Sequence, residues 1–123
     1  MILADTSVWI EHLRAGLPRL TTLLEAGLVL GHPYVAAELA LGSMRGRGQV
    51  LRLLDGLRRA PLLRPDEVRL LIERHRLWGR GIGLVDAALL GACLLEGDAR
   101  LWTLDRRLSA VAGDLGVALQ PAP

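Results

Sequence analysis

The chain has 123 residues, of which 51% are hydrophobic and 23% charged, and its formal net charge is +2. These values predict one globular domain with its own hydrophobic core, and they exclude an intrinsically disordered chain. A single cysteine leaves no internal disulfide framework, no apolar run reaches membrane-spanning length, and the N-terminus MILADTSVWIEH has no basic leader, so we expect a cytoplasmic protein that does not act at a membrane.

Apolar runs and helix-breaking residues divide the first half of the chain into alternating strands and helices. The run ILAD at 2–5 predicts a buried strand that leads into a helix, because Thr6 and Ser7 are helix-capping residues. Glycine and proline then mark where helices end or begin. The elements expected here are a strand at 2–5, helices at 7–14 and 19–26, a strand at 28–31, and helices at 33–44 and 49–59.

The second half continues this alternation, with ARLWTLD at 99–105 as the clearest strand of the sequence. The elements expected here are a small strand at 62–63, helices at 65–78 and 81–95, a strand at 99–105, a helix at 106–116 and a last strand at 117–120. Continuous apolar strands that alternate with helices predict an α/β fold with a mostly parallel central sheet. We expect a single domain that spans 1–123.

Four acidic residues stand out by their positions. Asp5 and Asp105 each close a predicted strand, and functional groups of parallel sheets gather at the carboxyl ends of the strands. Glu38 lies in the apolar helical segment PYVAAELALG, and Asp86 is the one carboxylate in GIGLVDAALLGACLL. Taken singly, Asp5 and Asp105 can serve as helix caps and Glu38 can face solvent. The apolar neighbours of Asp86, three and four positions away, instead favour a positive partner.

The combination of these acids indicates a cation site. Carboxylates about 4 Å apart repel by roughly 4 kcal/mol per pair at an effective dielectric constant of 20, so a cluster persists only if it is protonated or holds cations. Oxygen ligands without a cysteine or histidine constellation favour Mg²⁺ or Mn²⁺, and the three histidines of this chain are scattered. Such a site is suited to hydrolysis at phosphate, because a divalent ion activates water and clamps the reacting oxygens.

Four segments, in a fixed order along the chain, resemble a known family. They are ILADTSVWI at 2–10, HPYVAAELALGSM at 32–44, GIGLVDAALLGACLL at 81–95 and LWTLDRRL at 101–108. They resemble the PIN domain and, within it, the VapC-type ribonuclease toxins of type II toxin–antitoxin systems. The resemblance implies a three-layer α/β/α fold. It also implies an acidic pocket whose catalytic residues and ligands of Mg²⁺ or Mn²⁺ are Asp5, Glu38, Asp86 and Asp105.

The resemblance further implies an activity and partners. The expected activity is metal-dependent endoribonuclease cleavage that leaves 5′-phosphate ends, on RNA such as tRNA or rRNA. Members of the family are typically homodimers, and a cognate antitoxin protein silences them, in some cases by placing an arginine in the acidic pocket. Thr6 and Thr103 would orient carboxylates or water, or act as structural caps. Arginines near the acids in sequence, at positions 45, 80 and 106, are candidates for phosphate contact.

The aromatic residues are few, and we expect Trp9 and Trp102 to pack in the core. Trp78 precedes a glycine-rich loop, and its role stays open between packing and base stacking.

Two other functions are compatible with acids at strand ends. Receiver domains and aspartyl-phosphate phosphatases use a lysine beside the acyl phosphate, and every basic residue of this chain is arginine. The segment ADTS also lacks the second acid, two residues after Asp5, that such phosphatases carry. The remaining alternative is a catalytically inactive PIN-like module that binds a partner, and the presence of all four acids disfavours it.

Overall fold

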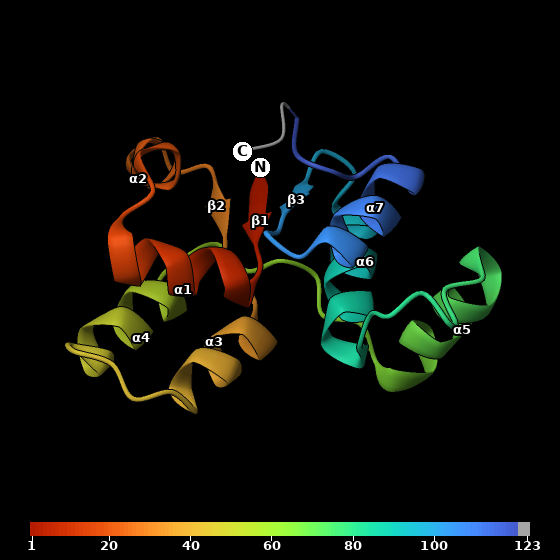
Figure 1. The fold of residues 1–123 in the computed structure, drawn as a ribbon, viewed down its shortest axis with the longest axis horizontal. Helices are drawn as coiled ribbons and strands as arrows, with labels where there is room; N and C mark the ends of the chain where they lie inside the picture. Colours follow the sequence, from red (N-terminus) through yellow and green to blue (C-terminus); the bar gives the residue numbers. More distant parts are fainter. Residues whose placement is uncertain (121–123) are drawn as a thin grey trace.

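The sheet at the centre of the molecule is parallel. The computed structural model describes residues 1–120, in which three strands form one sheet of order β2-β1-β3 (Figure 1). The strands are β1 (Ile2–Ala4), β2 (Val29–Leu30) and β3 (Arg100–Trp102). Leu3 of β1 stands opposite Leu30 on one side and Leu101 on the other. The predicted α/β class with a parallel sheet is confirmed.

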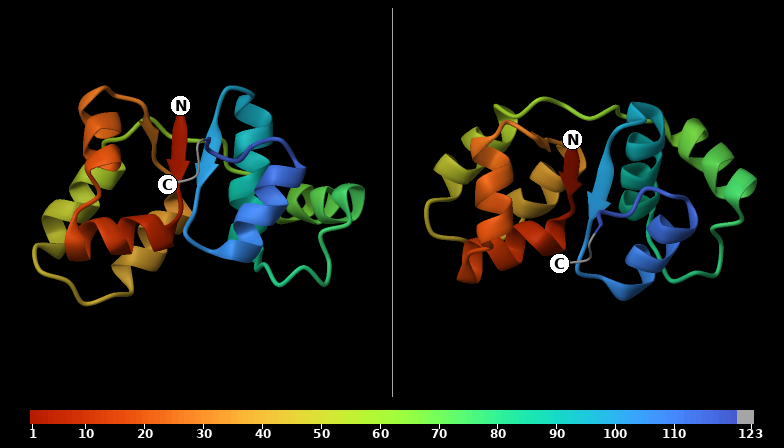
Figure 2. Two further views of the ribbon diagram at one scale, coloured as in Figure 1. Left: turned by 45° about the horizontal axis from the view of Figure 1, so that its top comes forward. Right: turned by 90° about the horizontal axis from the view of Figure 1, so that it is seen from above.

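Helices cover both sides of this sheet. They are α1 (Thr6–Ala15), α2 (Pro18–Glu25), α3 (Pro33–Ala40), α4 (Arg47–Asp55), α5 (Pro65–His75), α6 (Leu84–Glu96) and α7 (Arg106–Asp114). The first four gather on one side, and α5, α6 and α7 lie on the other (Figures 1 and 2). Within residues 1–120, none of these helices combines the length and the apolar character that a bilayer crossing requires.

The order of the strands creates a switch point at β1. The chain passes from β1 to β2 on one side of the sheet and then returns to β3 on the other side of β1. Because all three strands are parallel, their carboxyl ends meet at one edge, where ligands of open α/β sheets bind. Asp5 directly follows β1, and residues 103–105 directly follow β3. The fold therefore places both segments side by side at that edge.

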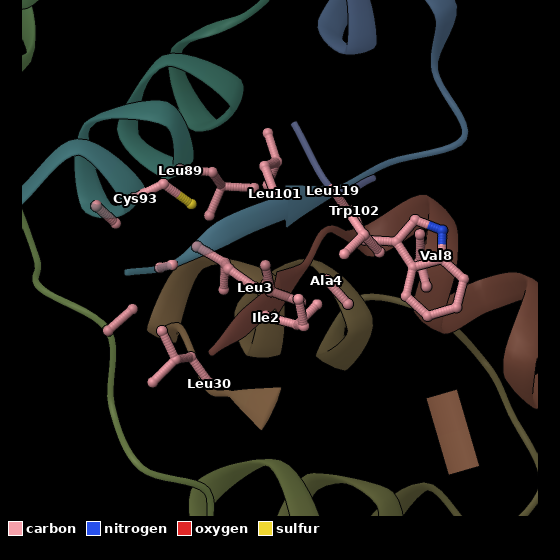
Figure 3. Close-up of a cluster of buried hydrophobic side chains, with 14 of the residues drawn as sticks. Ile2, Leu3, Ala4, Val8, Leu30, Leu89, Cys93, Leu101, Trp102 and Leu119 are labelled. Atoms are coloured by element: carbon pink, nitrogen blue, oxygen red, sulfur yellow. The ribbon is translucent and has the colours of Figure 1, made fainter. Parts of the chain in front are cut away.

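The strands are buried on both faces, which explains why they read as continuous apolar runs. Figure 3 shows Leu89 and Cys93 of α6 beside Leu101 of β3, and all three side chains are buried. Burial of the side chain raises the pKa of Cys93 to about 12, so this thiol is a neutral core residue. Trp9 and Trp102 are 2% and 1% exposed, which confirms their predicted place in the core.

The predicted strand at 62–63 is wrong. Residues 58–60 pair with the edge of the sheet instead: the Gly31 amide donates to the Arg58 carbonyl and the Ala60 amide to the Gly31 carbonyl, each at 2.8 Å. Pro61 and Pro65, on either side of the predicted strand, lack the amide hydrogens that a strand ladder needs. The pairing therefore occurs just before Pro61.

The other differences concern where elements end. The predicted last strand at 117–120 is reduced to one bridge between Leu101 and Ala118. The helix predicted over 65–78 ends at His75, because Arg76 adopts a left-handed conformation with φ of 54°. The helix predicted over 33–44 ends at Ala40.

Candidate functional site

Asp5 is the buried anchor of the site, with 5% of its surface exposed. It caps α1: its Oδ1 accepts a hydrogen bond from the Val8 amide at 3.1 Å and a second from the Ser7 hydroxyl at 2.6 Å. Its Oδ2 accepts a short hydrogen bond from the Thr103 hydroxyl. Aspartate is a preferred residue at this helix position because its side chain satisfies an amide left unpaired in the first turn. One carboxylate thus ties β1, α1 and the segment after β3 together.

Hydroxyl groups extend this connection to the loop between β3 and α7. The Leu104 amide donates to Ser7 Oγ at 3.0 Å, and the Asp105 amide donates to Thr103 Oγ1 at 3.0 Å. Asp105 itself caps α7, because its Oδ1 accepts from the Leu108 amide at 2.9 Å. Ser7 was not predicted as a site residue. The sequence pattern that could have indicated this role is a serine two residues after an aspartate, because in the first turn of a helix the serine hydroxyl can reach the aspartate side chain.

Glu38 reaches the site from α3. Its Oε1 accepts a hydrogen bond from the Thr6 hydroxyl at 2.6 Å, which joins the first turn of α1 to the last turn of α3. Glu38 is exposed, whereas Thr6 is half-buried. Both threonines singled out from the sequence, Thr6 and Thr103, therefore donate to carboxylates, and each of these hydrogen bonds joins elements that are distant in the chain.

Asp86 lies in the first turn of α6 and completes the group. Its Oδ2 accepts a hydrogen bond from the Gly83 amide at 3.1 Å. Partial burial raises the pKa of Asp86, and the negative charges of Asp5, Asp105 and Glu38 raise it further, whereas the Gly83 hydrogen bond lowers it. The other three carboxylates, each from a different segment of the chain, are thus close enough to Asp86 to repel it. None of them forms an ion pair with a basic residue within 1–120.

The four acidic side chains are neighbours, but they are not arranged as a complete set of metal ligands. In the part of the chain that the structure describes, no group of three or more histidine, cysteine, aspartate or glutamate side chains is already arranged to hold an ion. The three acids other than Asp5 each accept a hydrogen bond through only one carboxylate oxygen. These oxygens are Glu38 Oε1, Asp86 Oδ2 and Asp105 Oδ1. The second oxygen of each has no hydrogen-bond partner among residues 1–120. An all-oxygen set with unused lone pairs and mutual repulsion fits a hard divalent cation.

The basic residues that the sequence predicts near the site make no ion pair with its carboxylates within residues 1–120. Of the arginines predicted to contact phosphate, Arg80 pairs with Asp114 of α7 at 2.8 Å, while Arg45 and Arg106 are exposed. His32 follows β2 and is buried; burial and then the charge of Arg59 lower its pKa to about 4, so the ring is neutral at physiological pH. Its Nδ1 caps α3 by accepting from the Tyr34 amide at 3.1 Å. His32 is therefore a helix cap.

Acidic residues at the switch point of a parallel sheet are compatible with a PIN domain, and the comparison with known families shows that the chain is one. The chain belongs to the PIN domain family, whose sequence profile matches residues 2–114. Its sequence is 57% identical over 122 residues to "Ribonuclease VapC32" of Mycobacterium tuberculosis, in strains CDC 1551 / Oshkosh and ATCC 25618 / H37Rv alike. These matches cover 97% of this chain and 96% of each relative. The resemblance to VapC-type PIN domains that the four sequence segments carried is confirmed.

Proposed function

We propose that this protein is a VapC-type endoribonuclease, the toxin of a toxin–antitoxin pair, in which Asp5, Glu38, Asp86 and Asp105 hold Mg²⁺ or Mn²⁺ and act as the catalytic residues. The observation that carries the proposal is the convergence of the four acidic segments at one edge of the sheet. Thr103 donates to Asp5, Thr6 donates to Glu38, and Asp5, Asp105 and Glu38 lie close enough to Asp86 to raise its pKa. Membership of the PIN domain family and the match to Ribonuclease VapC32 support the same function. The whole chain, 1–123, would serve as one nuclease domain.

The divalent ion would supply an activated water and charge stabilisation at the phosphate undergoing hydrolysis. The residues of this chain prepare the site for it. Asp5 is held rigidly by the Ser7 and Thr103 hydroxyls and by the Val8 amide, so its carboxylate does not need to be ordered when the ion binds. Glu38, Asp86 and Asp105 each present an oxygen that no described residue uses. Repulsion of Asp86 by the other three acids favours occupancy by a cation.

The partners follow from the same proposal. The substrate would be RNA with unpaired segments, such as tRNA or rRNA. A cognate antitoxin protein would silence the enzyme by bringing an arginine to the carboxylates, which lack a cationic partner within residues 1–120. The protein would act in the cytoplasm as a homodimer.

Cleavage of RNA in the presence of a divalent ion tests the proposal. The wild-type protein, incubated with a mixture of structured RNAs and Mg²⁺ or Mn²⁺, should produce discrete fragments with 5′-phosphate ends, and EDTA should abolish them. Asp86→Asn should reduce the rate by at least about 100-fold, since removal of one group that stabilises a transition state typically costs two to three orders of magnitude. Asp66→Asn is the matched control, because Asp66 lies in the first turn of α5 and is exposed.

Equal cleavage by wild type and the folded Asp86→Asn protein would place the activity elsewhere. Absence of cleavage by the wild type under every divalent ion would favour the alternative, a PIN-like module that only binds a partner.

A further inference from the structure

An apolar pocket lies beside the acidic site, between the end of α5 and the start of α6. Its volume is about 210 Å³, and Trp78, Ile82, Gly83 and Leu84 are among the residues that line it. Trp78 is 60% exposed and Leu84 is 65% exposed. Exposed large side chains that line a common hollow are the usual mark of a binding surface.

Trp78 differs from the other two tryptophans of the chain. Trp9 and Trp102 are almost completely buried in the core, and the packing of the sheet explains both. Trp78 follows the last turn of α5, and most of its surface is exposed. Its indole ring is a large planar surface in contact with water, which is the property that a base-stacking residue needs.

The pocket and the acids share a residue. Gly83 lines the pocket, and its amide donates the hydrogen bond to Asp86 Oδ2 at 3.1 Å. Leu84 and Asp86 are both in the first turn of α6, and one helical turn rises only about 5 Å. A nucleotide whose phosphate lies at the acidic site is therefore within reach of the pocket with an adjacent base.

Two arginine side chains lie at the loop that follows Trp78. Arg80 belongs to this loop, and its side chain, which forms an ion pair with Asp114, is 35% exposed. Arg107 of α7 lies against Gly81, since a Cβ built on that glycine would be 2.5 Å from Arg107 Cδ. These features match the parts of a nucleotide chain. The apolar hollow suits a base, the guanidinium groups beside it suit a phosphate, and the carboxylates suit a second phosphate that is bound through a cation.

We propose that this pocket binds an unpaired nucleobase of the RNA substrate, stacked on the indole ring of Trp78. The inference rests on the proposed ribonuclease function and adds to it a binding subsite for the substrate. A base within a double helix has both faces covered by its neighbours, so the pocket selects single-stranded segments and loops. Arg80 and Arg107 would contact the phosphates that flank this base.

Tryptophan fluorescence tests the proposal directly, because the buried Trp9 and Trp102 contribute a constant background. The experiment uses the full chain with Asp86→Asn, Mg²⁺ and a single-stranded RNA oligonucleotide, whose integrity is checked on a gel. Binding should quench Trp78, and Trp78→Ala should weaken binding by about 10- to 100-fold. Trp78→Phe should retain most of the affinity. Leu28→Ala, which removes another exposed apolar side chain far from α6 in sequence, should bind like its parent.

Three results would overturn the proposal. The first is equal affinity of the Trp78→Ala and parent proteins for the oligonucleotide. The second is equal binding of a blunt RNA duplex and of the single strand. The third is quenching of Trp78 that grows with protein concentration without RNA, which would assign the pocket to a second copy of the chain. The proposed function fails separately, if the wild type does not cleave RNA at all.

Discussion

The substitution Asp86→Asn should stabilise the metal-free protein at neutral pH. The pKa of Asp86 is raised in the folded state, first by burial and then by the charges of Asp5, Asp105 and Glu38. A carboxyl group whose pKa is higher folded than unfolded binds a proton more tightly in the folded state. Its contribution therefore favours folding at low pH and becomes unfavourable as the pH rises through the folded pKa. Asparagine removes this cost.

The magnitude follows from the three like-charged neighbours. Charge pairs close to solvent are each worth about 0.2–1 kcal/mol, and Asp86 is only half-buried, so we expect a net gain of about 1 kcal/mol. Asparagine can still accept the hydrogen bond from the Gly83 amide, so the first turn of α6 keeps its cap. For a chain of this size, such a gain raises the melting temperature by about 3–5 °C.

Urea denaturation in EDTA, followed by circular dichroism at several pH values, measures this gain. The difference between Asp86→Asn and wild type should be largest near pH 7 and should vanish as the pH falls below the ordinary aspartate pKa. Asp66→Asn is again the matched control: an Arg64 hydrogen bond lowers the pKa of Asp66, so this substitution should give no gain. A lower stability of Asp86→Asn than of wild type at pH 7 in EDTA would refute the reasoning, because it would make Asp86 a favourable structural partner.

Two further predictions concern residues that position the site. Ser7→Ala removes the hydroxyl that donates to Asp5 and accepts from the Leu104 amide, and it should cost about 1–3 kcal/mol in urea denaturation, with Ser7→Thr losing less; no loss would show that the loop after β3 is held by other contacts. His32 has its pKa lowered to about 4, so its contribution to stability is present above the unfolded pKa of about 6.5 and should be lost, by about 3 kcal/mol, as the pH falls toward 4. His32→Asn keeps a side chain that caps α3 and should flatten this pH dependence; an unchanged slope would assign the acid sensitivity to another group.

The class of fold could be predicted from the sequence because parallel strands that are buried on both faces are short, nearly continuous apolar runs. The runs around β1 and β3 are mainly apolar, and each is followed by an acid that caps the next helix. The prediction of a strand at 62–63 was wrong because Pro61 and Pro65 were taken as the boundaries of a strand, whereas they lack the amide hydrogens that strand pairing needs. Pairing at residues 58–60 depends on the tertiary approach of Gly31, which no local pattern records.

The sequence predicted fewer features of the candidate site than of the fold. The order of the strands predicts that Asp5 and Asp105 meet at one edge of the sheet, and in the structure Asp5, Asp105 and Glu38 all lie within electrostatic reach of Asp86. Ser7 escaped prediction because its importance comes from a contact with the Leu104 amide, which lies 97 residues away in the chain. The sequence also gave no sign that each carboxylate other than that of Asp5 is held through one oxygen, since this depends on the local geometry of first helical turns.

The measurement that bears most directly on a shared cation site is a titration with Mn²⁺, in which electron paramagnetic resonance reports the free ion. Wild type should bind Mn²⁺. Asp86→Asn and Asp105→Asn should each bind it at least about tenfold more weakly, a loss of roughly 1.4 kcal/mol per variant, whereas Asp66→Asn should bind like wild type. Equal affinity of wild type, Asp86→Asn and Asp105→Asn for Mn²⁺ would contradict the claim that carboxylates from distant segments hold one ion together.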